Sequence, residues 1–143
     1  MAVITIDKTA FVPADGTTSA EIETIARKGA VGVAGMAAYI DSNGDAALVD
    51  CNAASDTAGD KARFKGFYAS TVEVAGQRVN LVTGGTITTD AVWTKGMVYA
   101  VSQTAGKLIA INELTTGDWV CIVGVALSTT KFMIFPVFAN IQI

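Results

Sequence analysis

The chain has 143 residues, enough for one domain with a core of its own, and 51% of them are apolar while 16% are charged. This balance excludes an intrinsically disordered chain, which combines low hydrophobicity with high net charge. The net charge of −3, with no basic run longer than Arg27-Lys28, excludes nucleic acid and an anionic membrane as partners.

An extended N-terminal arm is the first predicted element, over residues 1–16. Ile4 and Ile6 alternate with polar neighbours, as in a strand with one apolar face, and the turn-forming sequence Pro13-Ala-Asp-Gly16 ends the arm. The arm either pairs with its own sheet as an edge strand or reaches a neighbouring molecule. In the second arrangement we expect Ile4, Ile6 and Phe11 to contact the partner.

The rest of the chain, residues 17–143, is expected to form a single β-rich domain. Its opening segment, residues 17–28, fits two structures. Thr18 and Glu21 have the capping-box spacing of a helix start, but the segment is short and rich in β-branched residues. We therefore predict a strand there.

A hairpin is predicted next. Apolar residues within 29–40 lead to Asn43-Gly44, a dipeptide that tolerates positive φ at both central positions of a tight turn. Residues 47–49 return as a strand. The polar stretch that follows, residues 51–61, is predicted to be a loop.

Short strands separated by turn signals continue to the end of the chain. They are predicted at residues 64–68, 71–74, 78–82, 97–101, 107–111, 119–127 and 132–138. Thr83-Gly-Gly85 is predicted to turn the chain between two of them, and Pro136 suits an edge strand or a strand end. This regularity predicts an all-β fold, a small sandwich or barrel of antiparallel strands.

Two stretches of the sequence echo each other. Residues 35–49 and 96–111 both begin Gly-Met, run through an apolar strand with a Tyr, turn at a Gly and return apolar. Each is followed by a polar loop and by a strand with a glycine in its middle, Gly66 or Gly124. Such a glycine marks a bulge or a close backbone approach. The echo predicts an internal duplication, and its alternative is chance similarity between β-rich segments.

The most informative absence is histidine, since the chain has none. This removes the commonest general base, the commonest metal ligand and every Ser-His or Cys-His pair. Asp41-Ser-Asn-Gly-Asp45 is similar to the start of a calcium loop. However, Ala46 and Asn52 stand where an EF-hand needs Gly and Glu, so a hairpin turn is predicted. Cys51 and Cys121 are expected to be buried free thiols, and we expect no cofactor.

The acidic and aromatic side chains favour structural roles. A glycosidase needs a pair of carboxylates, but no spacing singles out a pair, so the acidic residues are expected at the solvated surface. The candidates are Glu21, Glu23, Asp60, Glu73, Asp90, Glu113 and Asp118. Trp93, Tyr99 and Trp119 fit core or interface packing better than stacking on a sugar or a base.

The apolar content predicts contacts between chains. The mean hydropathy of +0.46 is high, and a single small domain cannot easily hide so much apolar surface. Phe132, Phe135 and Phe138 recur at odd spacing, so one strand would place them on alternating faces. We expect some of them to reach a neighbouring chain.

A rhythm of Gly, apolar strand, polar turn with Gly and second strand runs through Ala34-Gly-Met-Ala-Ala-Tyr-Ile-Asp-Ser-Asn-Gly-Asp45 and Lys65-Gly-Phe-Tyr-Ala-Ser70. The same rhythm returns in residues 75–82, 97–107 and 123–127. Over residues 29–138 the chain thus resembles the small head-decoration proteins of tailed bacteriophages, also called capsid cement proteins.

The resemblance implies a β-rich structural protein of the virion with no catalytic residues. It implies a homotrimer, bound outside the capsid at three-fold or quasi-three-fold positions, that cements neighbouring subunits of its partner, the major capsid protein. Residues 1–8 lack a signal peptide, and no apolar run reaches the roughly 20 residues that span a bilayer, so synthesis in the host cytoplasm is expected. The alternative is a tail or head-fibre module that binds a host-surface glycan through its aromatic residues.

Overall fold

The computed structural model describes residues 3–6, 20–25, 33–53, 56, 58–69 and 78–143. Within these residues the chain forms β-strands and two short 3₁₀ turns, so the predicted all-β class is confirmed. The elements are β1 (Ala20–Ile25), β2 (Ala37–Ile40), β3 (Ala46–Leu48), η1 (Asp60–Ala62), β4 (Gly66–Tyr68), β5 (Val79–Thr88), β6 (Val98–Val101), β7 (Leu108–Ala110), η2 (Ile111–Glu113), β8 (Trp119–Ala126) and β9 (Lys131–Gln142). The predictions for Phe11, residues 13–16 and residues 71–77 lie outside the described residues.

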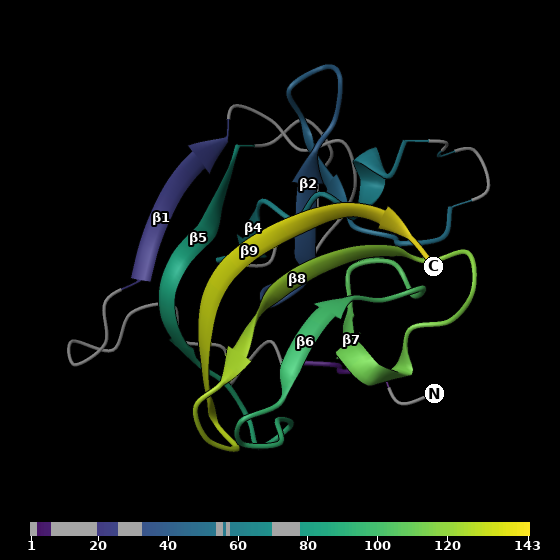
Figure 1. Cartoon of the computed structure of the whole chain (residues 1–143). Helices are drawn as coiled ribbons and strands as arrows, with labels where there is room; N and C mark the ends of the chain where they lie inside the picture. The colour runs from purple at the N-terminus through teal and green to yellow at the C-terminus, as the bar shows by residue number, and fades with distance from the viewer. Residues whose placement is uncertain (1–2, 7–19, 26–32, 54–55, 57, 70–77) are drawn as a thin grey trace.

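The strands form one antiparallel sheet that curls into a half-barrel (Figure 1). Its order is β3-β2-β4-β5-β9-β8-β6-β7, and β1 pairs with β5. The two ends of the curled sheet meet through single backbone bonds. The Ala37 N–H donates to the Gly106 carbonyl at 2.8 Å, and the Cys51 N–H donates to the Ser102 carbonyl at 3.1 Å. The β2–β3 and β6–β7 hairpins therefore lie together and close one side of the core.

Two five-stranded units that share β5 make up the sheet. The pairing order is β1-β5-β4-β2-β3 in the first unit and β5-β9-β8-β6-β7 in the second. Residues 79–85 of β5, with Thr83 skipped, pair with β1 along one edge, and residues 85–88 pair with β9 along the other edge. One continuous strand therefore closes the first unit and opens the second.

Matching hydrogen bonds show that the two echoing stretches of sequence adopt the same backbone arrangement. In the first unit Tyr68 exchanges two backbone bonds with the Gly-Met pair at residues 35–36, both of 2.9 Å. In the second unit Ala126 exchanges the same two bonds, of 2.8 and 3.0 Å, with the Gly-Met pair at residues 96–97. Both glycines adopt a left-handed φ, 88° and 81°. The two halves of the chain thus repeat one backbone geometry in detail.

The mid-strand glycines lie where backbones approach closely, as predicted. A Cβ on Gly66 would lie 2.7 Å from the carbonyl oxygen of Val82 on the neighbouring strand. A Cβ on Gly124 would collide with the carbonyl oxygen of Met133. Each unit therefore needs a residue without a side chain at this place.

The predicted turn at Thr83-Gly-Gly85 is wrong, because β5 runs through these residues. Its pairing with β1 skips one residue at Thr83, which makes a bulge, and Gly85 has a φ of 81°. A bulge and a left-handed glycine bend a strand without ending it. The glycines redirect β5 from the first unit to the second.

The β2–β3 hairpin is confirmed, but its loop has three residues rather than two. The Asp41 N–H donates to the Asp45 carbonyl at 2.9 Å, and the Gly44 N–H donates to the Asp41 carbonyl at 3.0 Å. Gly44 has a φ of 80°, whereas Asn43 is not left-handed. The Asp41 carboxylate accepts the N–H groups of Asn43 and Asp45, so it serves the turn, as the hairpin interpretation predicts.

The first and last strands, β1 and β9, differ in how closely they follow the prediction. The strand predicted within residues 17–28 is confirmed as β1. The last strand is longer than predicted, since β9 continues to Gln142 with Pro136 inside it. Pro136 lies where the register with β8 slips between Ile122 and Gly124, and an irregularity of this kind tolerates proline.

An aromatic cluster joins the two units in the core. Phe132 of β9 stacks on Trp93 with ring centroids 4.4 Å apart, and it meets Phe67 and Tyr99 edge-on at 6.3 and 6.1 Å. All four side chains are at most 3% exposed. The Trp93 Nε1–H donates to Thr89 Oγ1 at 2.6 Å. The core packing predicted for Trp93 and Tyr99 is confirmed.

In the described part of the chain, no helix has the length and apolar character to cross a bilayer.

Candidate functional surface

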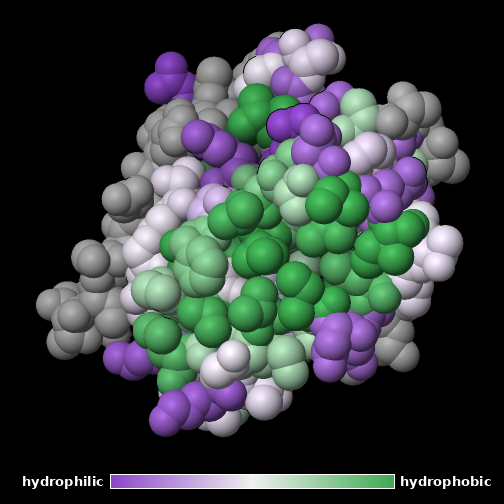
Figure 2. Space-filling view, viewed as in Figure 1, coloured by the Kyte–Doolittle hydropathy of each residue, from purple (hydrophilic) through white to green (hydrophobic). Residues whose placement is uncertain are grey.

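The large apolar side chains that the described residues expose all come from the last two strands and their flanks. They are Leu127 (43% exposed), Met133 (37%), Phe135 (39%), Val137 (48%), Ile141 (58%) and Ile143 (50%). We call this set the C-terminal apolar face. Figure 2 shows apolar surface gathered over β6, β8 and β9, with polar residues around its margin.

Cross-strand pairing builds this surface. Met133 pairs with Val125 of β8, which in turn pairs with Val98 of β6, so three apolar side chains form a row across three strands. Val137 and Ile122 pair in the same way farther along β9. Residues opposite each other on one face of a sheet pack together, so the rows form a continuous apolar surface.

Charge is nearly absent from this part of the chain. Residues 119–143 contain one charged side chain, Lys131, although the whole chain carries 23 charged residues. The surface can therefore be buried without the cost of removing ions from water.

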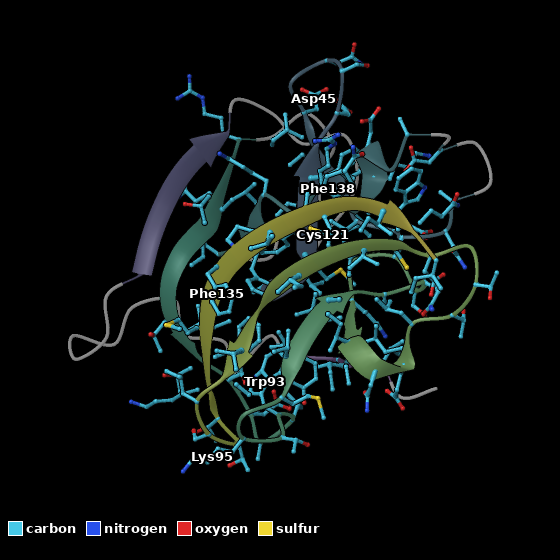
Figure 3. The ribbon with its side chains drawn as sticks, in the orientation of Figure 1. Asp45, Trp93, Lys95, Cys121, Phe135 and Phe138 are labelled. Carbon is cyan, nitrogen blue, oxygen red and sulfur yellow. The ribbon has the colours of Figure 1, made fainter. Side chains whose placement is uncertain are left out.

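The second half of β9 has a partner strand on one edge. β5 pairs with β9 as far as Ile134, and β8 pairs with β9 as far as Gln142. Among the described residues no strand pairs with the other edge of residues 135–142. Phe135 and Phe138 both belong to this stretch of β9 (Figure 3). Phe132 is buried, Phe135 is exposed and Phe138 is half-buried, so the predicted alternation of faces is confirmed.

The arm residues lie against their own domain. The Ile4 N–H donates to the Leu108 carbonyl at 2.7 Å in an isolated bridge to β7. Ile4 and Ile6 are half-buried and pack against the main core. A small cavity of about 40 Å³ remains beside them, lined also by Met36. Phe11 lies outside the described residues, and contact of the arm with a capsid subunit stays a prediction.

The aromatic residues proposed for a glycan are not grouped on the surface. Trp93 and Tyr99 are buried, so neither offers a ring face to a sugar. Trp119 is half-buried and stacks on Phe138 with centroids 6.4 Å apart, and the Arg63 guanidinium covers the Phe138 ring at 4.1 Å. The stack on Phe138 covers one face of the Trp119 ring, so the three aromatic side chains do not form a shared platform for a sugar.

The prediction that the acidic residues are solvated is wrong for Asp118. Its carboxylate is buried, with 1% of the residue exposed. Its Oδ2 accepts the backbone N–H of Thr115 at 2.8 Å, the Thr115 hydroxyl at 3.3 Å and the side-chain amide of Gln103. The Ile143 N–H also donates to the Asp118 carbonyl at 2.9 Å. Asp118 therefore ties the β6–β7 turn and the C-terminus to the start of β8.

Both cysteines are free and buried, as predicted. Burial raises the pKa of the Cys51 thiol, and the neighbouring Asp118 carboxylate raises it further. Burial also raises the pKa of the Cys121 thiol. A thiol held protonated and out of water is a poor nucleophile, so these side chains act as small core residues.

An open polar hollow beside β2 is the remaining candidate site. Tyr39 lines this hollow. Its pKa is raised first by burial and then by the charges of Asp41, Asp56 and Asp60. Asp41 caps the β2–β3 loop, and the Asp56 carboxylate accepts the N–H groups of Asp60 and Lys61 at 3.0 Å. No group of three or more acidic or sulfur side chains in the described residues is arranged to hold a metal ion. Local turns account for these carboxylates.

Searches against protein-family models, curated proteins and solved structures find no match to this chain. The sequence pointed to the C-terminal apolar face only through Phe135, one of the three phenylalanines of which some were expected to reach a neighbouring chain. The signal of the whole face was present as 25 consecutive residues, 119–143, with a single charge.

Proposed function

We propose that this protein is a structural protein of a tailed-phage virion that decorates and cements the capsid. The observation that supports this proposal is the exposed, uncharged C-terminal apolar face. A protein that acts by burying surface against its neighbours needs such a face. On a protein that remains a monomer in water, the same face promotes aggregation.

The proposed mechanism is multivalent burial of surface. An oligomer that touches several capsid subunits gains avidity, so each single contact can be weak. The N-terminal arm is the proposed capsid contact, through Ile4, Ile6 and Phe11. In the described residues the arm joins its sheet by the single bridge from Ile4 to Leu108, so little ordered structure is lost if the arm rebinds elsewhere.

Co-sedimentation with expanded, undecorated capsids of the encoding phage tests this function. The full chain is expected to bind saturably, and a variant lacking residues 2–12 is expected to stay folded but to lose binding. The substitution Asn43→Asp, at the distant β2–β3 loop, serves as a control that should bind normally. A full chain that does not bind contradicts the cementing function, and normal binding by the truncated chain contradicts the role of the arm.

A further inference from the structure

We propose that the open polar hollow beside β2 binds a primary alkylammonium group, as carried by a lysine side chain or a free diamine. This site goes beyond the proposed capsid role and does not depend on it. The end of β2 with the loop after it, on which Figure 3 labels Asp45, and η1 with its C-cap Arg63 supply most of the lining. The hollow has a volume of about 420 Å³, which is in the range of sites for small organic molecules.

Tyr39 brings an unpaired hydroxyl to the hollow. Its ring packs in the main core, and the residue is 9% exposed. Burial and then the charges of Asp41, Asp56 and Asp60 raise the pKa of Tyr39, so the hydroxyl lies within reach of all three carboxylates. Among the described residues no group forms a hydrogen bond with this hydroxyl. Because a buried polar side chain normally has a partner, the hydroxyl points to an occupant of the hollow.

The charge of the lining selects a cation. Three carboxylates and two cationic side chains line the hollow, which leaves a net charge of −1. One ammonium group neutralises this charge, whereas a phosphate or carboxylate ligand would add to it. The Arg63 guanidinium already serves other groups, since it lies 3.4 Å from the Asp60 carboxylate and 4.1 Å above the Phe138 ring.

The local turns hold the acceptor oxygens in place. Asp41 Oδ1 accepts the N–H groups of Asn43 and Asp45 at 2.9 and 3.0 Å. The two oxygens of Asp56 each accept one backbone N–H at 3.0 Å. These bonds use part of the capacity of each carboxylate, which has about four lone-pair sites. The three N–H donors of an ammonium group therefore meet acceptors that are already positioned.

The lining fits an organic cation better than a metal ion or a sugar. In the part of the chain that the structure describes, no three acidic or sulfur side chains are arranged to hold a metal ion. The Tyr39 ring is in the core, so it offers no face on which a sugar can stack. Ile40 adds an apolar side chain to the lining, and this suits the methylene stem that carries an alkylammonium group.

Titration of the ¹⁵N-labelled full chain with n-butylammonium chloride, followed by two-dimensional NMR, tests the site. We expect saturable shifts centred on residues 39–42 and 60–63. Asp41→Asn keeps an acceptor oxygen for the turn but removes the charge, and it should weaken binding about fivefold. Tyr39→Phe removes only the hydroxyl and should weaken binding about threefold. Glu113→Gln, which removes the same charge outside the hollow, should leave the affinity unchanged.

Two further probes distinguish the sources of the ammonium group. Tighter binding of 1,4-diaminobutane supports the site as one for a free diamine. Tighter binding of N-acetyl-lysine methylamide supports it as one for a lysine of a protein partner. A chain that binds n-butylammonium but not capsids supports this inference and contradicts the cementing function alone.

Three results overturn the proposal. The first is the absence of saturable shifts with n-butylammonium. The second is equal binding of 1-butanol or glucose, which carry no charge. The third is native affinity in both Asp41→Asn and Tyr39→Phe while their spectra remain those of the folded chain.

Discussion

Gly124 shows how strictly a single position can be determined by backbone packing. A Cβ there would collide with the Met133 carbonyl oxygen and lie 2.9 Å from the Phe132 ring. We expect Gly124→Ala to lower the free energy of unfolding by about 3 kcal/mol, because β8 and β9 must separate to admit it. Urea denaturation measures the loss.

Gly96 provides the matched control for that substitution. Its φ is 81°, but nothing lies within 4 Å of an added Cβ, so Gly96→Ala meets backbone strain alone. We expect a loss of about 1 kcal/mol. Equal losses for the two variants would mean that the close approach at Gly124 is not the dominant cost.

Asp118 is a position at which a single side chain joins several segments of the chain. Asp118→Ala leaves the donors of Thr115 and Gln103 without their acceptor, and we expect it to lower the free energy of unfolding by about 3 kcal/mol. Asp118→Asn keeps an acceptor oxygen and should cost less. Asp60→Ala, which removes an exposed 3.4 Å ion pair with Arg63, should cost about 0.5 kcal/mol at most. Thermal unfolding of the three variants should follow this order, and an equal loss for Asp60→Ala would contradict the role given to burial.

Strand β9 turns alternate phenylalanines into the core and outward. Phe132 stacks in the core and is fully buried, whereas Phe135, three residues on, faces outward. We expect Phe132→Ala to lower the free energy of unfolding by about 4 kcal/mol and Phe135→Ala by less than about 1 kcal/mol. Chemical denaturation at low protein concentration, followed by the fluorescence of Trp93 and Trp119 together, measures both losses. Similar losses would contradict the alternation of faces.

Short-range sequence signals were sufficient to predict the hairpins and the repeat, because turn residues and apolar alternation determine the backbone over only a few positions. They failed at Thr83-Gly-Gly85, since glycine serves a turn and a bent strand equally well. Only pairing with β1 and β9, each far away in sequence, distinguishes the two. Asp118 was misassigned for the same reason, because the Gln103 turn that buries it is contributed by another part of the chain.

The apolar face could not be located from the pattern of β9 because the strand is apolar on both sides. Phe132 and Ile134 alternate with Met133 and Phe135, so the sequence gives no polar face to mark the outside. Which side of β9 faces the core depends on the curl of the sheet. The curl in turn depends on the contact between the β2–β3 and β6–β7 hairpins.

At the scale of the whole molecule, buried ionisable groups make stability depend on alkaline pH. Burial raises the pKa of Tyr68 from its ordinary 10.0 to about 12, and burial raises the pKa of both thiols above their ordinary 9.0. Above these ordinary values the unfolded chain releases protons that the folded chain retains, so the free energy of unfolding falls as pH rises. We expect a plateau near pH 7–8 and, above about pH 9, a decline of up to ~1.4 kcal/mol per pH unit for each group.

Urea midpoints between pH 7 and pH 11 measure this decline. Tyr68→Phe should reduce the slope above about pH 10, where Tyr39 and the two thiols keep their own contributions. Thiol reagents should label the native chain far more slowly than the unfolded chain. A stability that rises between pH 9 and pH 11 would contradict the burial of these groups.

The shared strand has a consequence for how the molecule unfolds. Because β1 and β4 of the first unit and β9 of the second unit all pair with β5, neither unit can lose β5 without disrupting the other. The two units are therefore expected to come apart in one cooperative transition rather than in two. A repeat in the backbone does not divide this chain into two independent halves.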